Sequence, residues 1–263
     1  MKRYEGKTAL ITGAGTGIGA ATAKRLHSEG ARIALLGRRL EPLQSVAKET
    51  DGLVIQADAS SETDMVHALE LVKNTYGHLD VLVCNAGGFG FGTLLDSSDS
   101  DWAISVQANL NTAMVSARVC MPELVKTKGN ILIMSSIAGL AAGPEACGYV
   151  TMKHALVGLA KSITRDFGPK GVRCNTICPG WVRTEMADSE MAELVERTGL
   201  NSIEEAYAHV TKDVPLGRPA LAEDVASAVA FLCSKEAAMI TGATLTVDGG
   251  ATIVDVPTLA FSG

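Results

Sequence analysis

The sequence predicts an α/β protein: a single-domain, Rossmann-type fold with a doubly wound, parallel, seven-stranded sheet and helices on both faces. Short strand-like runs alternate with longer helical patterns along the whole chain. A glycine cluster joins the first strand-like run to the first helical pattern. No Pro/Ser-rich stretch, charge block or internal repeat divides the 263 residues, so we expect one domain over residues 1–263.

The expected strands are short runs of mostly apolar, often β-branched residues bounded by turn signals. They are Thr8–Thr12, Arg32–Leu36, Leu53–Ala57, Val81–Cys84, Asn130–Met134, Arg173–Ile177 and Leu245–Val247. The helical patterns between them are Ile18–Ser28, Glu41–Glu49, Glu62–Tyr76, Asp101–Lys126, Tyr149–Phe167 and Ala222–Leu232. This alternation favours a parallel sheet that is covered on both faces.

The segment from Glu185 to Val214 breaks the alternation. Apolar residues at i, i+3, i+4 spacing predict two short amphipathic helices in it: Met191, Leu194 and Val195, then Ile203, Ala206, Tyr207 and Val210. In Ser202-Ile203-Glu204-Glu205 we expect a capping box, in which serine and glutamate satisfy each other's free amides. An insertion after a strand lies where open α/β sheets bind ligands, so a lid over residues 185–214 is the functional interpretation. A merely structural helical hairpin is the alternative.

Composition excludes several classes of protein. A formal net charge of −6, with no basic cluster longer than Arg38-Arg39, argues against binding to nucleic acid or to anionic lipid. The six cysteines are scattered without a Cys-x-x-Cys pair, so we expect reduced thiols in a cytoplasmic protein and no metal site. No segment approaches 18 apolar residues, so no membrane span is expected.

The glycine cluster is Thr12-Gly13-Ala14-Gly15-Thr16-Gly17-Ile18-Gly19. Glycines let the backbone turn sharply, approach a pyrophosphate and present amides at a helix N-terminus, whose dipole favours anions. Tight turns also use glycine, but the position after a strand and before a helix predicts nucleotide binding. The Gly-x-x-x-x-Gly-Lys-Ser/Thr pattern of P-loop proteins is absent.

Tyr149 and Lys153 stand four residues apart in a helical pattern and therefore share one face. A phenol near pKa 10 is a poor base at neutral pH, and a neighbouring ammonium can lower its pKa. Ser136 ends the fifth expected strand, and Asn109 falls within the long helical pattern after Trp102. Alone, such a serine is usually a cap and such an asparagine is usually solvated.

Together these motifs resemble the short-chain dehydrogenase/reductase family, in its branch of about 250 residues, over essentially the whole chain. The matching motifs are Thr12 to Gly19, Asn85-Ala86-Gly87, the set Asn109, Ser136, Tyr149 and Lys153, the nicotinamide loop Pro179 to Thr184, and Val247-Asp248-Gly249-Gly250. The thirteen-residue step from Ser136 to Tyr149 is typical of the family. Asp58 occupies the position of the family's adenine-contacting aspartate.

The resemblance implies that hydride passes between the nicotinamide and a carbonyl carbon while Tyr149 supplies the proton. Ser136 would bind the carbonyl oxygen, Lys153 would hold the ribose hydroxyls and lower the Tyr149 pKa, and Asn109 would position a relay water. Thr184 would fix the carboxamide. The implied cofactor-binding residues are Gly13, Gly15, Thr16, Gly17, Ile18, Gly19, Arg38, Arg39, Asp58, Ala59, Asn85, Ala86, Gly87, Tyr149, Lys153, Pro179, Gly180, Val182 and Thr184. No metal is needed for this chemistry.

The expected function is an NAD(P)-dependent oxidoreductase that interconverts a secondary alcohol and a ketone on a small to medium, largely apolar substrate. We expect pocket walls from Phe89, Phe91, Leu140, Trp181, Met186, Met191 and Tyr207. The enzymatic alternatives are a 3-oxoacyl carrier-protein reductase and a hydroxysteroid or cyclic-alcohol dehydrogenase. A sugar-nucleotide epimerase would need a larger C-terminal domain, and a catalytically silent dinucleotide-binding regulator is the non-enzyme alternative.

The end of the second strand bears on the choice of cofactor. In NAD-preferring relatives an acidic residue there binds the ribose hydroxyls, but this chain has Gly37, followed by Arg38 and Arg39. Arg38 can pair with a 2′-phosphate, so NADP(H) is favoured, and NAD(H) stays possible because the glycine loop carries Thr16 rather than a basic residue.

The resemblance also implies a homotetramer or homodimer, built from the helices bearing Trp102 and Tyr149 and from the last helix with its strand. The tail Ala251–Gly263 is apolar enough that we expect it to pack, either within the chain or on a neighbouring subunit.

Overall fold

The structure, a computed structural model, describes residues 2–261, and within them seven parallel strands form one sheet. The strands are β1 (Thr8–Thr12), β2 (Arg32–Gly37), β3 (Leu53–Gln56), β4 (Val81–Cys84), β5 (Asn130–Met134), β6 (Arg173–Pro179) and β9 (Thr244–Val247). Their spatial order, β3-β2-β1-β4-β5-β6-β9, reverses direction between β1 and β4. The predicted doubly wound sheet is confirmed, with strand ends within two residues of the expected ones.

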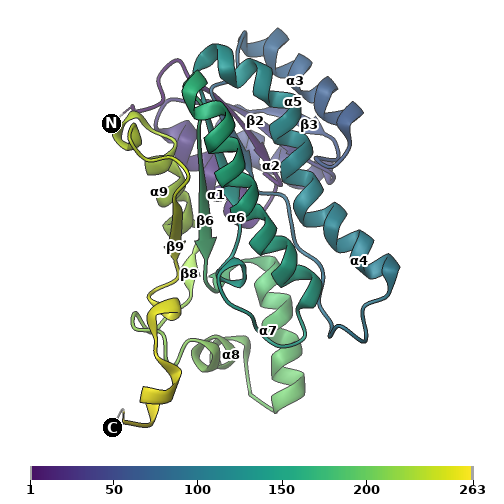
Figure 1. The fold of residues 1–263 in the computed structure, drawn as a ribbon, viewed down its shortest axis with the longest axis vertical. Helices are drawn as coiled ribbons and strands as arrows, with labels where there is room; N and C mark the ends of the chain where they lie inside the picture. Colours follow the sequence, from purple (N-terminus) through teal and green to yellow (C-terminus); the bar gives the residue numbers. More distant parts are fainter. Residues whose placement is uncertain (1, 262–263) are drawn as a thin grey trace.

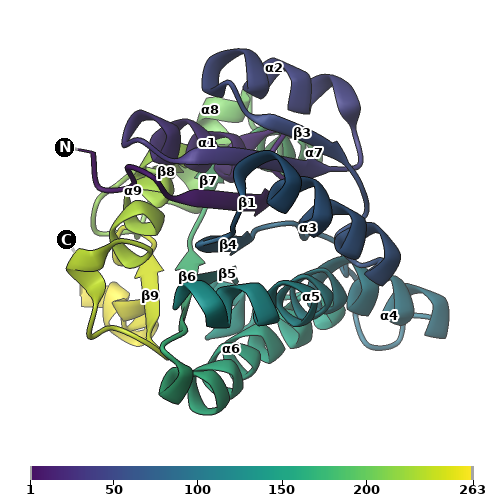
Figure 2. The same cartoon turned by 90° about the horizontal axis from the view of Figure 1, so that it is seen from above.

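Helices cover both faces of this sheet (Figures 1 and 2). One face carries α1 (Gly17–Ser28), α2 (Leu40–Thr50) and α9 (Ala222–Leu232), with α1 packed on α2 and on α9. The other face carries α3 (Glu62–Tyr76), α5 (Thr112–Thr127) and α6 (Cys147–Phe167), with α5 between the other two. The crossovers therefore place one apolar layer on each side of the strands.

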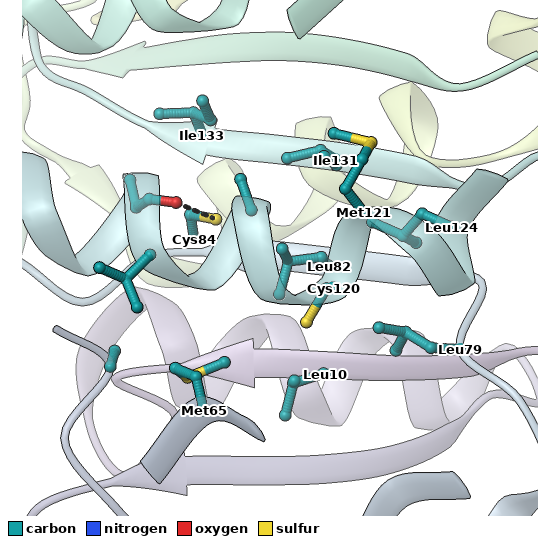
Figure 3. Close-up of a cluster of buried hydrophobic side chains, with 14 of the residues drawn as sticks. Leu10, Met65, Leu79, Leu82, Cys84, Cys120, Met121, Leu124, Ile131 and Ile133 are labelled. Atoms are coloured by element: carbon teal, nitrogen blue, oxygen red, sulfur yellow. Dashed lines mark hydrogen bonds between the residues drawn. The ribbon is translucent and has the colours of Figure 1, made fainter. Parts of the chain in front are cut away.

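The layer between the sheet and α3, α5 and α6 is a continuous apolar core (Figure 3). Leu10 and Leu82 reach it from adjacent strands, and Met65 and Leu124 meet them from α3 and α5. The Cys84 thiol donates a hydrogen bond to the carbonyl oxygen of Ala113 in this layer. All six cysteines lie in the described part of the chain; each is a free thiol, and only Cys147 is partly exposed.

The long helix expected over Asp101–Lys126 differs in two ways. It begins at α4 (Asp99–Ser105), because Ser98 and Asp101 form a capping box at its start. A π-helical stretch, η1 (Val106–Asn111), then separates α4 from α5. A π turn accommodates an extra residue, which changes where the following side chains point, and such turns often occur at functional sites.

The segment 185–214 folds as α7 (Glu185–Thr198) and α8 (Ile203–Val210), which lie beyond the carboxyl end of β6 (Figure 1). A two-stranded sheet of β7 (Val182–Arg183) and β8 (Ala220–Leu221) brackets them. Of the two hydrogen bonds of the expected capping box, one is present and the other is replaced. Ser202 Oγ does accept from the Glu205 amide, but Glu205 Oε2 accepts from the backbone and side chain of Asn201, the residue before the cap.

Candidate active site

The glycine loop between β1 and α1 holds a conformation that few other residues could adopt. Gly13 and Gly17 have φ angles of +64° and +52°, in the left-handed region that favours glycine. A Cβ on Gly19 would overlap the carbonyl oxygen of Gly13, because the loop folds back on the first turn of α1. These positions therefore require glycine, and the loop lies at the N-terminus of α1, where backbone amides and the helix dipole favour an anion such as pyrophosphate.

Asn85 and Thr12 tie this loop to the end of β4. Asn85 Nδ2 donates to the carbonyl oxygens of Thr12 and Gly13, each at 3.1 Å. Thr12 Oγ1 accepts from the backbone amides of Asn85 and Ala86, each at 3.0 Å. The Asn85-Ala86-Gly87 motif thus fixes the loop at the point where the strand order reverses, which is where doubly wound sheets bind dinucleotides.

We expect Gly19→Ala to weaken dinucleotide binding and to lower the thermal unfolding midpoint, because the added methyl group would displace the Gly13 carbonyl. Gly158→Ala is the matched control: Gly158 lies in α6 with nothing within 4 Å of the position of a Cβ. An alanine there should stabilise the protein by roughly 0.5–1 kcal/mol. Calorimetry with and without dinucleotide measures both effects; equal behaviour of the two variants would contradict this account of the loop.

Arg38 and Arg39 follow β2 and are exposed. The Gln56 side-chain amide donates to the carbonyl oxygen of Arg38, and Arg39 Nη2 donates to Thr16 Oγ1 at 3.4 Å. Partial burial acts to raise the pKa of Asp58, but two hydrogen bonds from Ser60 and the positive charge of Arg38 outweigh it and hold that pKa below its ordinary value. Arg38 and the ionised Asp58 therefore border the same end of the site, with the buried Ala59 beside them.

Tyr149, Lys153, Ser136 and Asn109 come from three different elements and meet after β4 and β5. Lys153 Nζ lies 5.4 Å from the centre of the Tyr149 ring and donates to the carbonyl oxygen of Met134 at 3.2 Å. A Cβ on Gly87 would lie 3.4 Å from Lys153 Nζ and 3.3 Å from Asn109 Oδ1. The absence of that Cβ leaves space between the lysine, the asparagine and the glycine backbone.

Burial dominates the acidities of this pair. It lowers the pKa of Lys153 from 10.5 to about 8. It also raises the pKa of Tyr149, against the opposing effect of its hydrogen bond with Ser136. The resemblance implied that Lys153 lowers the Tyr149 pKa; the protein alone shows the opposite net shift, because desolvation disfavours the charged form of both groups.

Asn109 is fully buried within η1, and its side-chain amide makes three hydrogen bonds to the backbone. Nδ2 donates to the carbonyl oxygens of Ser105 and Phe89, each at 3.0 Å, while Oδ1 accepts from the Gly88 amide at 2.9 Å. Both amide hydrogens are thereby used. Asn109 thus holds the loop after β4 in place, and only the remaining lone pair of Oδ1 is free for a relay water.

The Pro179–Thr184 segment reaches back to the glycine loop. A Cβ on Gly17 would lie 3.1 Å from Thr184 Cγ2, and a Cβ on Gly180 would lie 3.0 Å from the Asp248 Cβ. Val182 is buried, and Thr184 Oγ1 accepts from the Ala187 amide, which makes Thr184 the N-cap of α7. The Thr184 side chain therefore lies between the start of α7 and the N-terminus of α1.

Five of the seven residues expected to line a substrate pocket are exposed or partly exposed. Phe91 stacks on Tyr149 with ring centres 5.5 Å apart, and Met186 Cε lies 2.9 Å from the position of a Cβ on Gly88. Trp181 lines a cavity of about 130 Å³ next to Ile137. Phe89 and Leu140 are largely exposed on the loops after β4 and β5.

The other two, Met191 and Tyr207, lie elsewhere: they are 1% and 3% exposed and pack with Ala187 and Ala206 in the core between α7 and α8. Tyr207 also donates to Asp188 Oδ1 at 2.8 Å. Their helical spacing marks the inner face of the hairpin, where they are buried, and their role as pocket walls stays a prediction.

Gly88 and Gly90, in the loop after β4, also shape the site, although they were not among the residues predicted for it. Gly88 and Gly90 have φ angles of +116° and +112°, and a Cβ on Gly90 would overlap Ser105 Oγ. The Gly90 carbonyl oxygen accepts from the Tyr149 amide at 2.9 Å, so this loop positions the first turn of α6. The run Gly87-Gly88-Phe89-Gly90-Phe91-Gly92 carried that signal, because alternating glycines indicate unusual backbone angles.

A parallel sheet with a glycine loop at its switch point, and a tyrosine and a lysine gathered at the same edge, defines a dinucleotide-dependent oxidoreductase. The chain belongs to the short-chain dehydrogenase/reductase family, whose members use NAD(P)(H) on alcohol and ketone groups. The family model that matches residues 13–252 is described as enoyl-(acyl carrier protein) reductase.

Similar proteins cover nearly the whole chain. Protein MoaE of Klebsiella aerogenes is 47% identical over 259 residues, which are 97% of this chain and 99% of the relative. Meso-2,3-butanediol dehydrogenase of Serratia marcescens is 33% identical, over 96% of this chain and 97% of its own. A variant of the actinorhodin polyketide ketoreductase, solved with NADPH, superimposes with a TM-score of 0.88 at 32% identity, over 93% of this chain and 96% of its own.

The described residues were also compared with the requirements of a metal site and of a membrane span. Across residues 2–261 no group of three or more His, Cys, Asp or Glu side chains is placed to hold a metal ion. The helices described by the structure include none with the length and apolar character to cross a membrane.

Proposed function

We propose that this enzyme interconverts a secondary alcohol and a ketone on small to medium, largely apolar molecules, with Tyr149 as the acid/base. The observation that carries the proposal is the meeting of Tyr149, Lys153 and Asn109 around the side-chain-free Gly87. Phe89, Phe91 and Met186 supply apolar surface beside that point. Apolar walls with few polar anchors suit ketone substrates.

The dinucleotide supplies or accepts the hydride when it is bound. In the reduction direction the Tyr149 hydroxyl gives its proton to the carbonyl oxygen, and Ser136 donates a second hydrogen bond to that oxygen. Lys153 Nζ faces the space left by Gly87, where it can donate to ribose hydroxyls. Its positive charge then stabilises the phenolate that remains on Tyr149 after the proton has left.

The residues around the glycine loop fit a dinucleotide. The pyrophosphate would lie against the backbone of Gly13, Gly15 and Gly17, with Ile18 and Gly19 opening α1. Asn85, Ala86 and Gly87 would flank the riboses, and Asp58 the adenine. We propose NADP(H) as the preferred cofactor, because Gly37 offers no carboxylate against a 2′-phosphate and Arg38 offers a guanidinium.

Two other functions compete with this one. A 3-oxoacyl carrier-protein reductase would use the same chemistry on a longer substrate. The matching family model supports this alternative, because its description names an acyl carrier protein. A catalytically silent dinucleotide-binding regulator would have no use for Tyr149 beside a buried lysine. A screen of the purified protein tests these functions. Small ketones, cyclic ketones, steroids and a 3-oxoacyl thioester are each incubated with NADH or with NADPH, and turnover is measured as the decrease in nicotinamide absorbance. We expect turnover of a ketone with NADPH; cofactor binding without turnover of any member would contradict the proposal.

We further propose a homotetramer or homodimer, because apolar side chains remain exposed on the elements expected to associate. Trp102 and Ile104 of α4 are 39% and 44% exposed, and Leu245 of β9 is 37% exposed. The described part of the tail, up to Phe261, is also exposed at Ile253 and Val256; residues 262–263 lie outside the described residues. An equilibrium sedimentation mass of one chain would contradict this assembly.

Lys153→Met is expected to abolish turnover, weaken dinucleotide binding and stabilise the free protein at neutral pH. A pKa lowered from 10.5 to about 8 costs the folded state about 3 kcal/mol. The cost is fully present below pH 8 and disappears as the pH rises above 10.5, where lysine is neutral in both states. Loss of the hydrogen bond to the Met134 carbonyl oxygen offsets about 1 kcal/mol, which leaves a net gain of about 2 kcal/mol.

Urea unfolding at pH 7 and pH 10 without cofactor measures that gain, which should shrink at the higher pH. Lys161→Met is the control, because Lys161 is exposed on the same helix. A Lys153→Met variant that is less stable than the parent at pH 7 would show that the buried ammonium does not destabilise the folded state.

A further inference from the structure

One face of α7 is turned toward the proposed catalytic residues. Met186, Glu190 and Arg197 are spaced by four and seven residues, so they lie on the same side of the helix. Met186 Cε lies 2.9 Å from the position of a Cβ on Gly88, in the loop after β4. Arg197 Nη1 pairs with Glu145 Oε2 at 3.5 Å, just before α6. Glu190 lies between these two contacts and therefore faces the start of α6, where Tyr149 is found.

The Glu190 carboxylate is half-buried there and lacks a protein partner. In the part of the chain that the structure describes, no hydrogen bond or ion pair engages its side chain. Burial and the nearby charge of Glu193 raise the pKa of Glu190, and the Glu190 charge in turn contributes to the raised pKa of Tyr149. A half-buried carboxylate without a protein donor has lost part of its hydration, and a donor that arrives with a ligand would offset that cost.

Other acidic residues of α7 have an ordinary explanation. Asp188 accepts a hydrogen bond from the Tyr207 hydroxyl inside the hairpin. Glu193 and Glu196 are exposed to solvent. Glu190 differs from them because it combines partial burial, the lack of a partner among the described residues, and a position on the face that meets the loop after β4.

We propose that Glu190 is a specificity-determining residue that accepts a hydrogen bond from a second polar group of the substrate, a hydroxyl or an ammonium next to the reacting carbinol. The proposal rests on the proposed function and deepens it: the substrate is a vicinal diol or amino alcohol rather than a simple alcohol. Phe91, stacked on Tyr149, gives the apolar wall, and Glu190 gives the polar anchor opposite the acid/base. A site built to hydrogen-bond a substrate group discriminates strongly against analogues that lack it.

Three alcohols of nearly equal size test the role of Glu190: 3-methylbutan-2-ol, butane-2,3-diol and 3-aminobutan-2-ol. If the substrate screen identifies a better alcohol, the same three substituents are compared on that molecule. They differ only in the methyl, hydroxyl or ammonium group beside the carbinol. The wild type should prefer one of the two donor-bearing alcohols by at least about tenfold in kcat/KM over the methyl compound. Glu190→Leu should reduce that preference to about twofold or less, because leucine offers no acceptor.

Glu190→Gln distinguishes the two donors. An amide oxygen still accepts from a neutral hydroxyl, so a preference for the diol should survive in this variant. A preference for the ammonium should be lost, because it depends on the negative charge. Glu196→Leu is the matched control: it removes a carboxylate from the exposed side of the same helix and should leave every preference unchanged.

Dinucleotide affinity and unfolding midpoints of all variants check that the site and fold are intact. Equal kcat/KM for the three alcohols in the wild type, or a donor preference that survives Glu190→Leu, would overturn the inference while leaving the proposed function standing. Absence of turnover with every alcohol and ketone of the wider panel is a different outcome, and it would contradict the proposed function itself.

Discussion

Tyr149→Phe is expected to reduce kcat by about a thousandfold while leaving the dissociation constant of the dinucleotide nearly unchanged. The substitution deletes one phenolic oxygen at the position of proton transfer, and general acid/base catalysis is typically worth 10²–10⁴-fold. The ring itself remains, so the stacking with Phe91 and the contact with Lys153 are preserved. The glycine loop is not touched.

Single-turnover kinetics with bound NADPH measure the loss at the chemical step, and fluorescence titration measures cofactor affinity. Tyr76→Phe is the control: the Tyr76 hydroxyl, at the end of α3, donates to the Ile33 carbonyl oxygen of β2, and removing it should affect stability but not turnover. Activity within tenfold of the wild type in Tyr149→Phe would refute Tyr149 as the proton donor.

The fold and much of the candidate site could be predicted because each depends on local sequence signals. Strand ends were placed within two residues, since apolar runs bounded by glycine, asparagine or aspartate leave little freedom in a buried parallel sheet. The glycine loop was identifiable because its backbone angles restrict the residue type at Gly13 and Gly17. The i, i+4 spacing of Tyr149 and Lys153 predicted that both lie on one face of α6, and Lys153 Nζ does lie 5.4 Å from the centre of the Tyr149 ring.

The remaining features depend on contacts that periodicity does not encode. The π-helical η1 is not visible in an apolar pattern. Asn109, within it, donates to the carbonyl oxygen of Phe89 as well as to that of Ser105, and a contact with a residue twenty positions away is not encoded in local periodicity. Met191 and Tyr207 show the same limit from the other side. Their spacing gave two helices, each with an apolar face, but it could not tell whether those faces pack against each other or against a ligand.

The direction of the Tyr149 pKa shift shows why charge arguments from sequence are incomplete. Proximity of a lysine lowers a phenol's pKa in a polar site, yet both groups here lie where desolvation is the larger effect. Lys153 acts on Tyr149 most strongly when it carries its proton, and a bound ribose with hydroxyls near Lys153 Nζ would solvate that charge. Cofactor binding and acid/base activation are then coupled through the same ammonium.

Exchange of residues at the end of β2 is expected to reverse the choice of cofactor. Arg38→Ala should weaken NADPH binding by about 1–3 kcal/mol, because it removes charge-assisted hydrogen bonds to the 2′-phosphate, and should affect NADH far less. The corresponding loss of NADPH affinity is about 5- to 150-fold. Arg39→Ala serves as the comparison, since Arg39 donates to Thr16 on the glycine loop and should have the smaller effect on the difference between the cofactors.

Gly37→Asp tests the same idea by gain of function. A Cβ on Gly37 would meet nothing closer than Leu43 Cδ2, at 3.4 Å, which is ordinary van der Waals contact, so the side chain fits without displacing the strand. The new carboxylate can accept hydrogen bonds from both ribose hydroxyls of NADH and repels a 2′-phosphate. In Gly37→Asp combined with Arg38→Ala we therefore expect NADH to bind more tightly than NADPH.

Titration of the wild type and the variants with both cofactors decides the matter, and the informative quantity is the ratio of the two dissociation constants. That ratio cancels any general damage to the glycine loop, which both cofactors use equally. Because Arg38 already acts on the ionised Asp58, its removal should also let the Asp58 pKa rise toward its ordinary value, in both cofactor complexes alike. Equal losses of the two cofactors in Arg38→Ala, or a wild type that prefers NADH, would show that Arg38 does not recognise a phosphate.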